Sequence, residues 1–463
     1  MDEDVRQKIE NELKYLIRNS SEAEQMRVLL ELDRGTIRTL GWSKADAKKL
    51  LISRVGSASI LSRLSDVYMI AQHPLGNRDK WVLNYWDYIE EYLDRWFETI
   101  KLSTEMAIKE KQEVVDVLAR EYSNFIASVT DADITKWIDE IQNIDDLIRY
   151  AKEIMDGLYM DALLVFIQQY SMADIGIYVY NSEKDKLTKR GQTGFSLAYY
   201  GDPGAGKTFA TDDLLRGNER QGIPPHGIIG KLRYAEGMTP KQFIAILEAY
   251  QNYPVDWIIP EFRDFFRYPG MVEKLKLVME RREVSDETRT TKIGPYKVTS
   301  FFIVNYNLKL GKNGYKSTMS DPNFAAVEDR MICKLFINTK EREEQIFNNM
   351  LRIGSGDVDF YLADTLRKHI TYTYHWLVKN KPQVIIDYDL YKSFGQWLID
   401  EKQKYAPKAS LRMLERAIQI AASASLVKAL AENSQQIEIT EKELDLAKEF
   451  IEQELISRAL RSD

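Results

Sequence analysis

Cysteine and histidine are scarce in this chain. Cys333 is the single cysteine among 463 residues, so a disulfide within one chain and a zinc site built on cysteines are both excluded. The four histidines are scattered, and even His369 and His375 are six residues apart, a spacing that does not put two ligands on one helix face. The sequence therefore contains no pattern that predicts a zinc site.

Long apolar runs and a strong net charge are also missing. Because no stretch of about 18 uninterrupted apolar residues exists, we expect no membrane span, and the acidic start of the chain does not resemble a secretory signal. The formal net charge of −7 gives no overall signal for nucleic acid. With 44% hydrophobic and 29% charged residues, the composition is that of a globular protein of two or three domains. We expect an intracellular, cytoplasmic protein.

The most specific motif is an octapeptide that fits the pattern G-x-x-x-x-G-K-[ST]: Gly201-Asp202-Pro203-Gly204-Ala205-Gly206-Lys207-Thr208. An apolar run precedes it and a helix-compatible stretch follows it, which is the setting in which the motif binds phosphates. Glycines let several backbone N–H groups point at a phosphate chain. Lys207 would reach the β- and γ-phosphates, and the Thr208 hydroxyl would bind Mg²⁺. We therefore expect ATP and Mg²⁺ at this loop.

Hydrophobic periodicity divides the chain into three parts. Residues 1–185 show apolar positions at helical spacing and predict an α-helical N-terminal domain that binds DNA or a partner and supports oligomerisation. Within it, residues 35–53 weakly resemble a helix-turn-helix, although a solvated basic helix explains them equally well. Residues 186–345 alternate strand and helix, as in a parallel-sheet ATPase core, and residues 346–463 predict a C-terminal helical lid.

A phosphate-binding loop needs a second strand that ends in acidic residues. The best candidate is the apolar run 255–259, which is followed by Pro260 and Glu261. Glu261 is the candidate catalytic base, whereas Pro260 stands where an aspartate that orients Mg²⁺ is usual. Asp264, or Asp256 under a shifted register, are alternative Mg²⁺ partners, but alternate residues of a strand point to opposite faces. Reduced hydrolysis, with Mg²⁺ held mainly through Thr208 and water, is a second interpretation.

Two further polar groups follow strands in the expected order. The β-prone run 300–304 ends in Asn305-Tyr306-Asn307, and an amide at the tip of a strand beside the phosphate loop can sense the γ-phosphate and hold a water molecule. Arg330 precedes another predicted strand, from which it can reach the γ-phosphate of a neighbouring subunit and stabilise transition-state charge. The order of these residues along the chain is more informative than any one of them.

With these residues in place, 195–463 resembles the AAA+ ATPases and, among them, the ATPase module of the MCM replicative helicases. The segment 307–311 is similar to Asn-Pro-Lys-Phe-Gly of that family, 279–285 to Met-Glu-Gln-Gln-x-Val-Ser, and 366–372 to Leu-Arg-Lys-Tyr-Ile-x-Tyr. The resemblance implies that Asn307 is the sensor, Arg330 the arginine finger and Arg412 the second sensor arginine. The missing aspartate at Pro260 and the helical N-terminal part depart from the family, as expected of a divergent member from an archaeal mobile element or virus.

The resemblance also implies a function. MCM-like modules form rings with ATP between subunits, and hairpins that face the channel grip nucleic acid. The hairpin-like stretch before Asn307 offers Arg289, Lys292 and Lys297 as DNA-contact candidates, although solvated hairpin residues are an equal alternative. We therefore expect an ATP-driven DNA translocase or helicase that acts in replication as a hexamer-like ring. The alternatives are a protein-remodelling ATPase of the MoxR type and a slowly hydrolysing replication initiator or loader.

Overall fold

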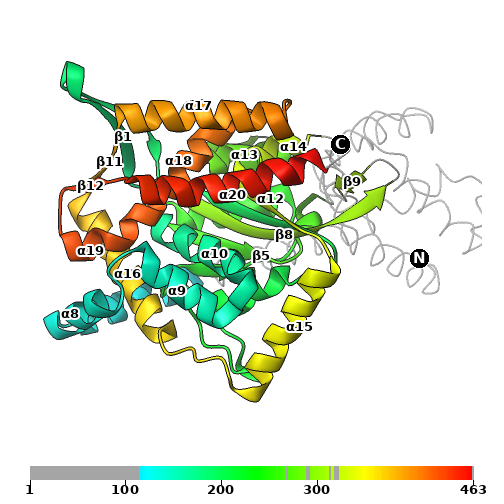
Figure 1. Ribbon diagram of the computed structural model, residues 1–463, viewed down its shortest axis with the longest axis horizontal. Helices are drawn as coiled ribbons and strands as arrows, with labels where there is room; N and C mark the ends of the chain where they lie inside the picture. The colour runs from blue at the N-terminus through cyan, green and yellow to red at the C-terminus, as the bar shows by residue number, and fades with distance from the viewer. Residues whose placement is uncertain (1–113, 267–269, 288–291, 312–313, 318–322, 461–463) are drawn as a thin grey trace, which may run out of the picture. The chain divides into compact units, whose positions relative to one another are not determined.

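The computed structural model describes residues 114–266, 270–287, 292–311, 314–317 and 323–460 (Figure 1). The chain divides into two compact units, Met1–Glu110 and Lys111–Asp463. The helix-turn-helix-like segment and most of the predicted N-terminal domain lie outside the described residues. The described residues all belong to the second unit.

The centre of this unit is a sheet of five parallel strands with the spatial order β10-β3-β8-β5-β4. The strands in chain order are β3 (Ser196–Gly201), β4 (Leu232–Tyr234), β5 (Val255–Ile259), β8 (Ser300–Gly311) and β10 (Met331–Phe336). Every residue of β3 and β5 is buried, as expected where helices cover both faces of a parallel sheet. The fold is thus mixed α/β, and its sheet is compatible with the P-loop core that the sequence predicts.

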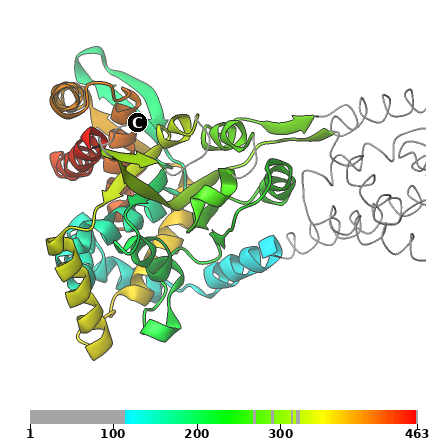
Figure 2. The ribbon, with the colours of Figure 1, turned by 90° about the vertical axis from the view of Figure 1, so that its right-hand side faces the viewer.

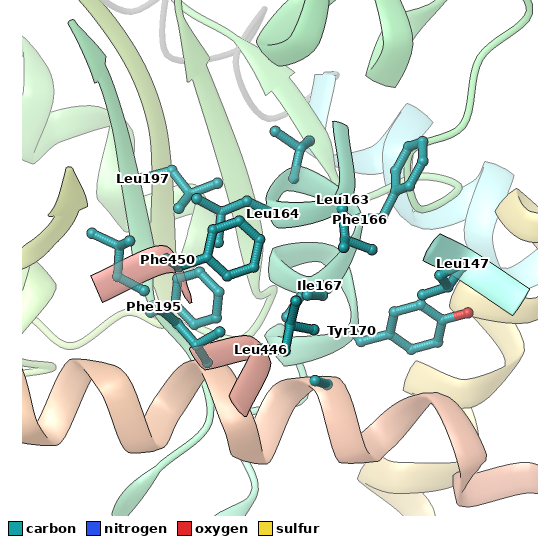
Figure 3. Close-up of a cluster of buried hydrophobic side chains, with 14 of the residues drawn as sticks. Leu147, Leu163, Leu164, Phe166, Ile167, Tyr170, Phe195, Leu197, Leu446 and Phe450 are labelled. Atoms are coloured by element: carbon teal, nitrogen blue, oxygen red, sulfur yellow. The ribbon is translucent and has the colours of Figure 1, made fainter. Parts of the chain in front are cut away.

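Alternate residues of the strands belong to two different cores. Leu197 of β3 and Ile258 of β5 pack with helices α9 (Ile144–Met155) and α10 (Tyr159–Ser171). On the opposite face, Trp257 packs with α12 (Pro240–Leu247) and α13 (Met271–Met279). Figure 2 shows these two pairs of helices on opposite sides of the strands. Side chains of α10 fill the space between the sheet and the C-terminal helices, where Phe450 reaches toward Leu197 (Figure 3).

A smaller sheet joins distant parts of the sequence. It has the order β12-β11-β1-β2, formed by β1 (Gly176–Asn181), β2 (Lys186–Gln192), β11 (Gln383–Asp387) and β12 (Gln436–Glu438). Strand β1 pairs in parallel with β11, so residues before the five-stranded sheet and residues after it lie in one sheet. Helices α9 and α10 and strand β1, which precede the boundary predicted at residue 185, thus belong to the same unit as the central sheet, and the C-terminal part is helical with two added strands.

Several helices begin at residues that helix capping favours. Asn143 and Asp146 form a capping box at α9, and Thr440 and Glu443 do the same at α20 (Glu441–Ala459). The Thr339 side chain caps α15 (Lys340–Ser355). The other helices are α8 (Asp131–Glu140), α11 (Leu214–Arg216), α14 (Ala325–Glu328), α16 (Ala363–Asn380), α17 (Tyr388–Tyr405), α18 (Arg412–Ser425) and α19 (Ala429–Glu432). Residues 114–128 form a further helix.

Two antiparallel hairpins complete the unit. Strands β6 (Val284–Glu287) and β7 (Lys292–Tyr296) form the hairpin that the sequence predicts before Asn307, and β9 (Gly314–Ser317) pairs with the extended end of β8. Of the DNA-contact candidates, Lys292 begins β7, Lys297 is exposed just after it, and Arg289 lies outside the described residues. None of the helices described here has the length and apolarity that crossing a membrane requires.

Candidate functional site

The phosphate loop connects the end of β3 to a helix that begins at Lys207. Three of its residues, Gly201, Gly204 and Gly206, have φ angles of 143°, 79° and 86°, which side chains with a Cβ rarely adopt. At Gly201 a Cβ would lie 1.8 Å from the carbonyl oxygen of Phe336 in β10. The Asp202 N–H donates to that same oxygen at 2.9 Å. Glycine at the first position of the motif therefore lets the loop start directly against the neighbouring strand.

Lys207 is buried at the base of the loop, with 7% of its surface exposed. Its Nζ donates to the carbonyl oxygens of Asp202, at 2.5 Å, and Gly201, at 3.4 Å. Burial lowers the pKa of Lys207 to about 8, while the carboxylates of Asp202 and Glu261 oppose this shift. An anion in the loop would restore the full charge of the ammonium group, so the site is electrostatically suited to phosphate.

The helix after the loop contains a π-helical turn, η3 (Phe209–Asp213), followed by α11. Such turns are rare and occur frequently at functional sites. Thr208 is exposed at the start of this helix and lines the cavity described next, as the sequence predicts for a Mg²⁺ partner. Thr211 donates its hydroxyl proton to the Lys207 carbonyl oxygen at 2.9 Å, so its own hydroxyl oxygen is available as an acceptor.

The loop opens onto a cavity of about 760 Å³, the size of a small-molecule site. Part of its lining is polar and comes from the loop and from the residues that follow β5 and β8. Another part is apolar and comes from Met155 and Leu158 before α10 and from Ile346, Met350 and Ile353 of α15. Ile346 lies beside the loop, because a Cβ at Gly206 would be 3.6 Å from its Cδ1.

Glu261 lies close enough to Lys207 for its carboxylate to act on the pKa of the lysine. It is exposed, stands two residues after β5, and lines the cavity together with Pro260. The two alternative Mg²⁺ partners do not line it. Asp256 is fully buried, and its carboxylate accepts a hydrogen bond from Gln169 Nε2 of α10 at 2.7 Å. The register shift that would bring Asp256 to the metal therefore does not occur, because its side chain belongs to the face that α10 covers.

Asn305 and Asn307 both line the cavity. In the pairing of β8 with β3, Asn307 stands opposite Gly201, so it lies beside the start of the loop, although β8 itself continues to Gly311. Asn305 stands two residues earlier, 3% exposed, and its Nδ2 donates to the Thr211 hydroxyl at 2.8 Å. Asn305 thus anchors the helix beneath the loop, whereas Asn307 lies level with the beginning of the loop.

The two sequence-predicted arginines do not line this cavity. Arg330 donates from Nε at 2.8 Å and from Nη2 to Glu280 Oε1, and its side chain is 13% exposed. Arg412 is exposed at the first position of α18. The cavity is therefore built without either of them.

A third arginine, which sequence reasoning missed, does reach the loop. Arg342, in the first turn of α15, donates from Nε to the Ala205 carbonyl oxygen at 3.0 Å and from Nη2 to Asp161 Oδ2 at 2.6 Å. The available signal was Asp161, an acid within a helix that is apolar nearly all round, because a buried aspartate that stays ionised needs a cationic partner. Nothing in the sequence around Arg342 identifies it as that partner.

The donor set fits Mg²⁺ that is held largely by the nucleotide. Mg²⁺ prefers oxygen ligands and is usually bound by one or two carboxylates together with substrate phosphates and water. The cavity offers the Thr208 hydroxyl for this purpose, and the carboxylates of Asp161, Asp213 and Glu261 also line it. Among the residues that the structure describes, no group of three or more His, Cys, Asp or Glu side chains is arranged to hold a metal without a substrate.

No model of a known protein family matches this chain, and no curated protein matches it either.

Proposed function

We propose that this chain binds ATP in the cavity, hydrolyses it, and uses the energy to move along DNA as a ring-shaped oligomer of the MCM-like AAA+ type. The observation that carries the proposal is that the phosphate loop, Glu261 and Asn307 surround one cavity although they lie far apart in the sequence. Nucleotide binding and hydrolysis are supported by this geometry. The DNA and ring parts are supported by the resemblance of residues 195–463.

The chemistry proposed for the site needs few groups. The loop N–H groups and Lys207 neutralise the phosphate chain, and the Thr208 hydroxyl would help to hold Mg²⁺, which would supply further positive charge to the phosphates. Glu261 accepts a proton from the water molecule that attacks the γ-phosphate, and Asn307 orients that water. Breaking the bond between the β- and γ-phosphates then releases ADP and inorganic phosphate.

Arg330 is assigned to the transition state of a neighbouring subunit. This requires Arg330 to exchange Glu280 for a phosphate oxygen. The exchange leaves Glu280 with a second cation, because Arg282 Nε already lies 3.2 Å from its Oε2. An arginine supplied in this way raises the hydrolysis rate by about a thousandfold or more in related chemistry.

The test is ATP hydrolysis by the full chain with and without forked DNA, over a range of salt concentrations. We expect Lys207→Ala to lose nucleotide binding, and Glu261→Gln to keep binding but lose turnover. Arg330→Ala should reduce hydrolysis strongly. Arg282→Ala is its matched control, because Arg282 also pairs with Glu280 but is 69% exposed. Hydrolysis that ignores DNA at every salt concentration would contradict the translocase, since phosphate contacts must be salt-dependent.

A slow nucleotide switch, such as an initiator or loader, is the second candidate function. Pro260 favours it, because Glu261 is the single acidic residue that follows β5 at the cavity. Single-turnover hydrolysis separates the two functions. A motor should turn over at about 1 s⁻¹ or faster, as ordinary enzymes do. A rate far below this value that DNA does not raise would favour the switch.

A further inference from the structure

A buried ion cluster lies directly behind the phosphate loop. Asp161 of α10 is 2% exposed and accepts from Lys334 Nζ of β10 at 2.8 Å and from Arg342 Nη2 of α15 at 2.6 Å. Burial alone would raise the pKa of Asp161, but these two cations hold it below its ordinary value. The carboxylate thus stays ionised and fixes one cation with each of its oxygens.

Arg342 is held on three sides. Asp161 binds one end of its guanidinium, the ring of Phe336 lies 4.3 Å from its centre, and its Nε donates to the Ala205 carbonyl oxygen. Fifteen per cent of the side chain is exposed. Because a guanidinium is planar and its donors form a rigid fork, anchoring one side at Asp161 fixes the direction in which Nε points. The Ala205 carbonyl oxygen therefore accepts from Arg342 Nε, whose position is fixed by Asp161 and not by the loop.

This contact determines the orientation of a peptide group in the loop. In a planar trans peptide, the carbonyl of Ala205 and the N–H of Gly206 point in opposite directions. Because the Ala205 carbonyl points toward Arg342, the Gly206 N–H points away from Arg342. Ala205 lies between Gly204 and Gly206, and both glycines have positive φ angles that leave the backbone free to rotate at low cost. The loop sequence alone does not choose between the two orientations of this peptide.

We propose that Arg342 is a positioning residue that holds the Ala205–Gly206 peptide with its N–H toward the bound phosphates. The inference rests on the proposed nucleotide site. Arg342 acts on the loop and is not itself assigned a contact with the reacting atoms. Arg342 itself lines the cavity, as do Ile346 and Met350 of the same helix. A nucleotide in the cavity would therefore meet a loop and a helix that are joined by one side chain.

The test uses the full chain and two measurements. Hydrogen–deuterium exchange of residues 202–216 without nucleotide reports on the loop itself, and the dissociation constant for ATP reports on binding. Arg342→Ala should speed exchange in this segment and weaken ATP binding by about tenfold or more, the effect of losing a hydrogen bond to a charged group. Arg342→Lys should be intermediate, because it keeps the charge but lacks the fork.

Arg352→Ala is the matched control. Arg352 lies on the same helix and donates to the Glu153 carbonyl oxygen at 2.7 Å, but it does not line the cavity. It should leave both measurements close to those of the wild type. Unchanged exchange in Arg342→Ala would overturn the inference, and so would faster exchange with unchanged affinity. Failure of the wild type to bind ATP would instead refute the proposed function, and the exchange comparison would still decide whether Arg342 holds the loop.

Discussion

Replacing Asp256 with asparagine should stabilise the protein at alkaline pH and not at acidic pH. Asp256 is completely buried in β5 and no basic side chain pairs with it among the described residues. Burial raises its pKa from 3.8 to about 7, although hydrogen bonds from the neighbouring glutamines oppose this. One of its oxygens, Oδ1, has no hydrogen-bond partner in the part of the chain that the structure describes.

The sign of the effect follows from proton binding. Between about pH 4 and pH 7 the folded state holds a proton that the unfolded chain has released, so stability falls as pH rises and levels off above pH 7. Between pH 5 and the folded-state pKa of about 7 lie about two pH units, over which the free energy of unfolding falls by about 3 kcal/mol. Asparagine cannot ionise, and its carbonyl oxygen can still accept the hydrogen bond from Gln169. The melting temperature of Asp256→Asn should therefore gain several degrees on the wild type between pH 5 and pH 8.

The assay is thermal unfolding of both proteins at pH 5, 6, 7 and 8, with the difference between them as the measured quantity. Other titrating groups, such as the buried histidines, contribute equally to both proteins and cancel. Asp161→Asn is the contrast, because a buried aspartate whose pKa stays low should give a difference that does not vary over this range. A constant difference for Asp256→Asn would refute the assignment of a raised pKa. Loss of ATP hydrolysis in a folded Asp256→Asn protein would instead revive its role at the metal.

Two further predictions concern the loop. ATP affinity should fall by up to tenfold per pH unit above about pH 8, because the protein without nucleotide then loses the Lys207 proton that phosphate binding needs. Lys207→Arg, measured in the same pH series, should abolish the decline. A decline that persists in Lys207→Arg would mean that another group titrates. Gly201→Ala should lower the melting temperature strongly, because its Cβ would collide with the Phe336 carbonyl. Gly204→Ala, whose Cβ would meet no atom within 4 Å but whose φ is also positive, should lower the free energy of unfolding by about 1 kcal/mol. Equal losses for the two variants would mean that β10 shifts to make room for a Cβ at residue 201.

The geometry around the loop could be predicted because it depends on local sequence and on one rule of sheets. A glycine-rich motif between an apolar run and a helix is a local pattern, and β3 and the loop lie where it indicates. The carboxyl ends of parallel strands meet at one edge, so residues that follow different strands come together. The pairing of Gly201 with Asn307 is an instance of this rule. The same alternation of faces made Asp256 a poor substitute for the acid missing at Pro260, and its bond to α10 explains why.

The domain boundary was not predictable on the same basis. Periodicity shows that the residues of α10 are buried all round, but it does not show what covers them. Their partners are the sheet and the helices α18 and α20, which lie far later in the chain. Strand β1 likewise finds its parallel partner in β11. A helical pattern before a strand–helix alternation therefore looks like a separate domain although it completes the core.

Arg330 and Arg342 differ in what happens to the carboxylate partner when the ion pair is broken. Neither has a local signature, since Glu280 and Asp161 lie 50 and 181 residues away along the chain. The Glu280 side chain is 25% exposed and keeps Arg282 as a second cation, so it still has a partner when Arg330 leaves. Asp161 is 3% exposed, and removing Arg342 would strip Oδ2 of its partner, which costs about 3–5 kcal/mol for a buried pair. Arg330 is accordingly suited to exchange its partner during a reaction cycle, and Arg342 is suited to hold one.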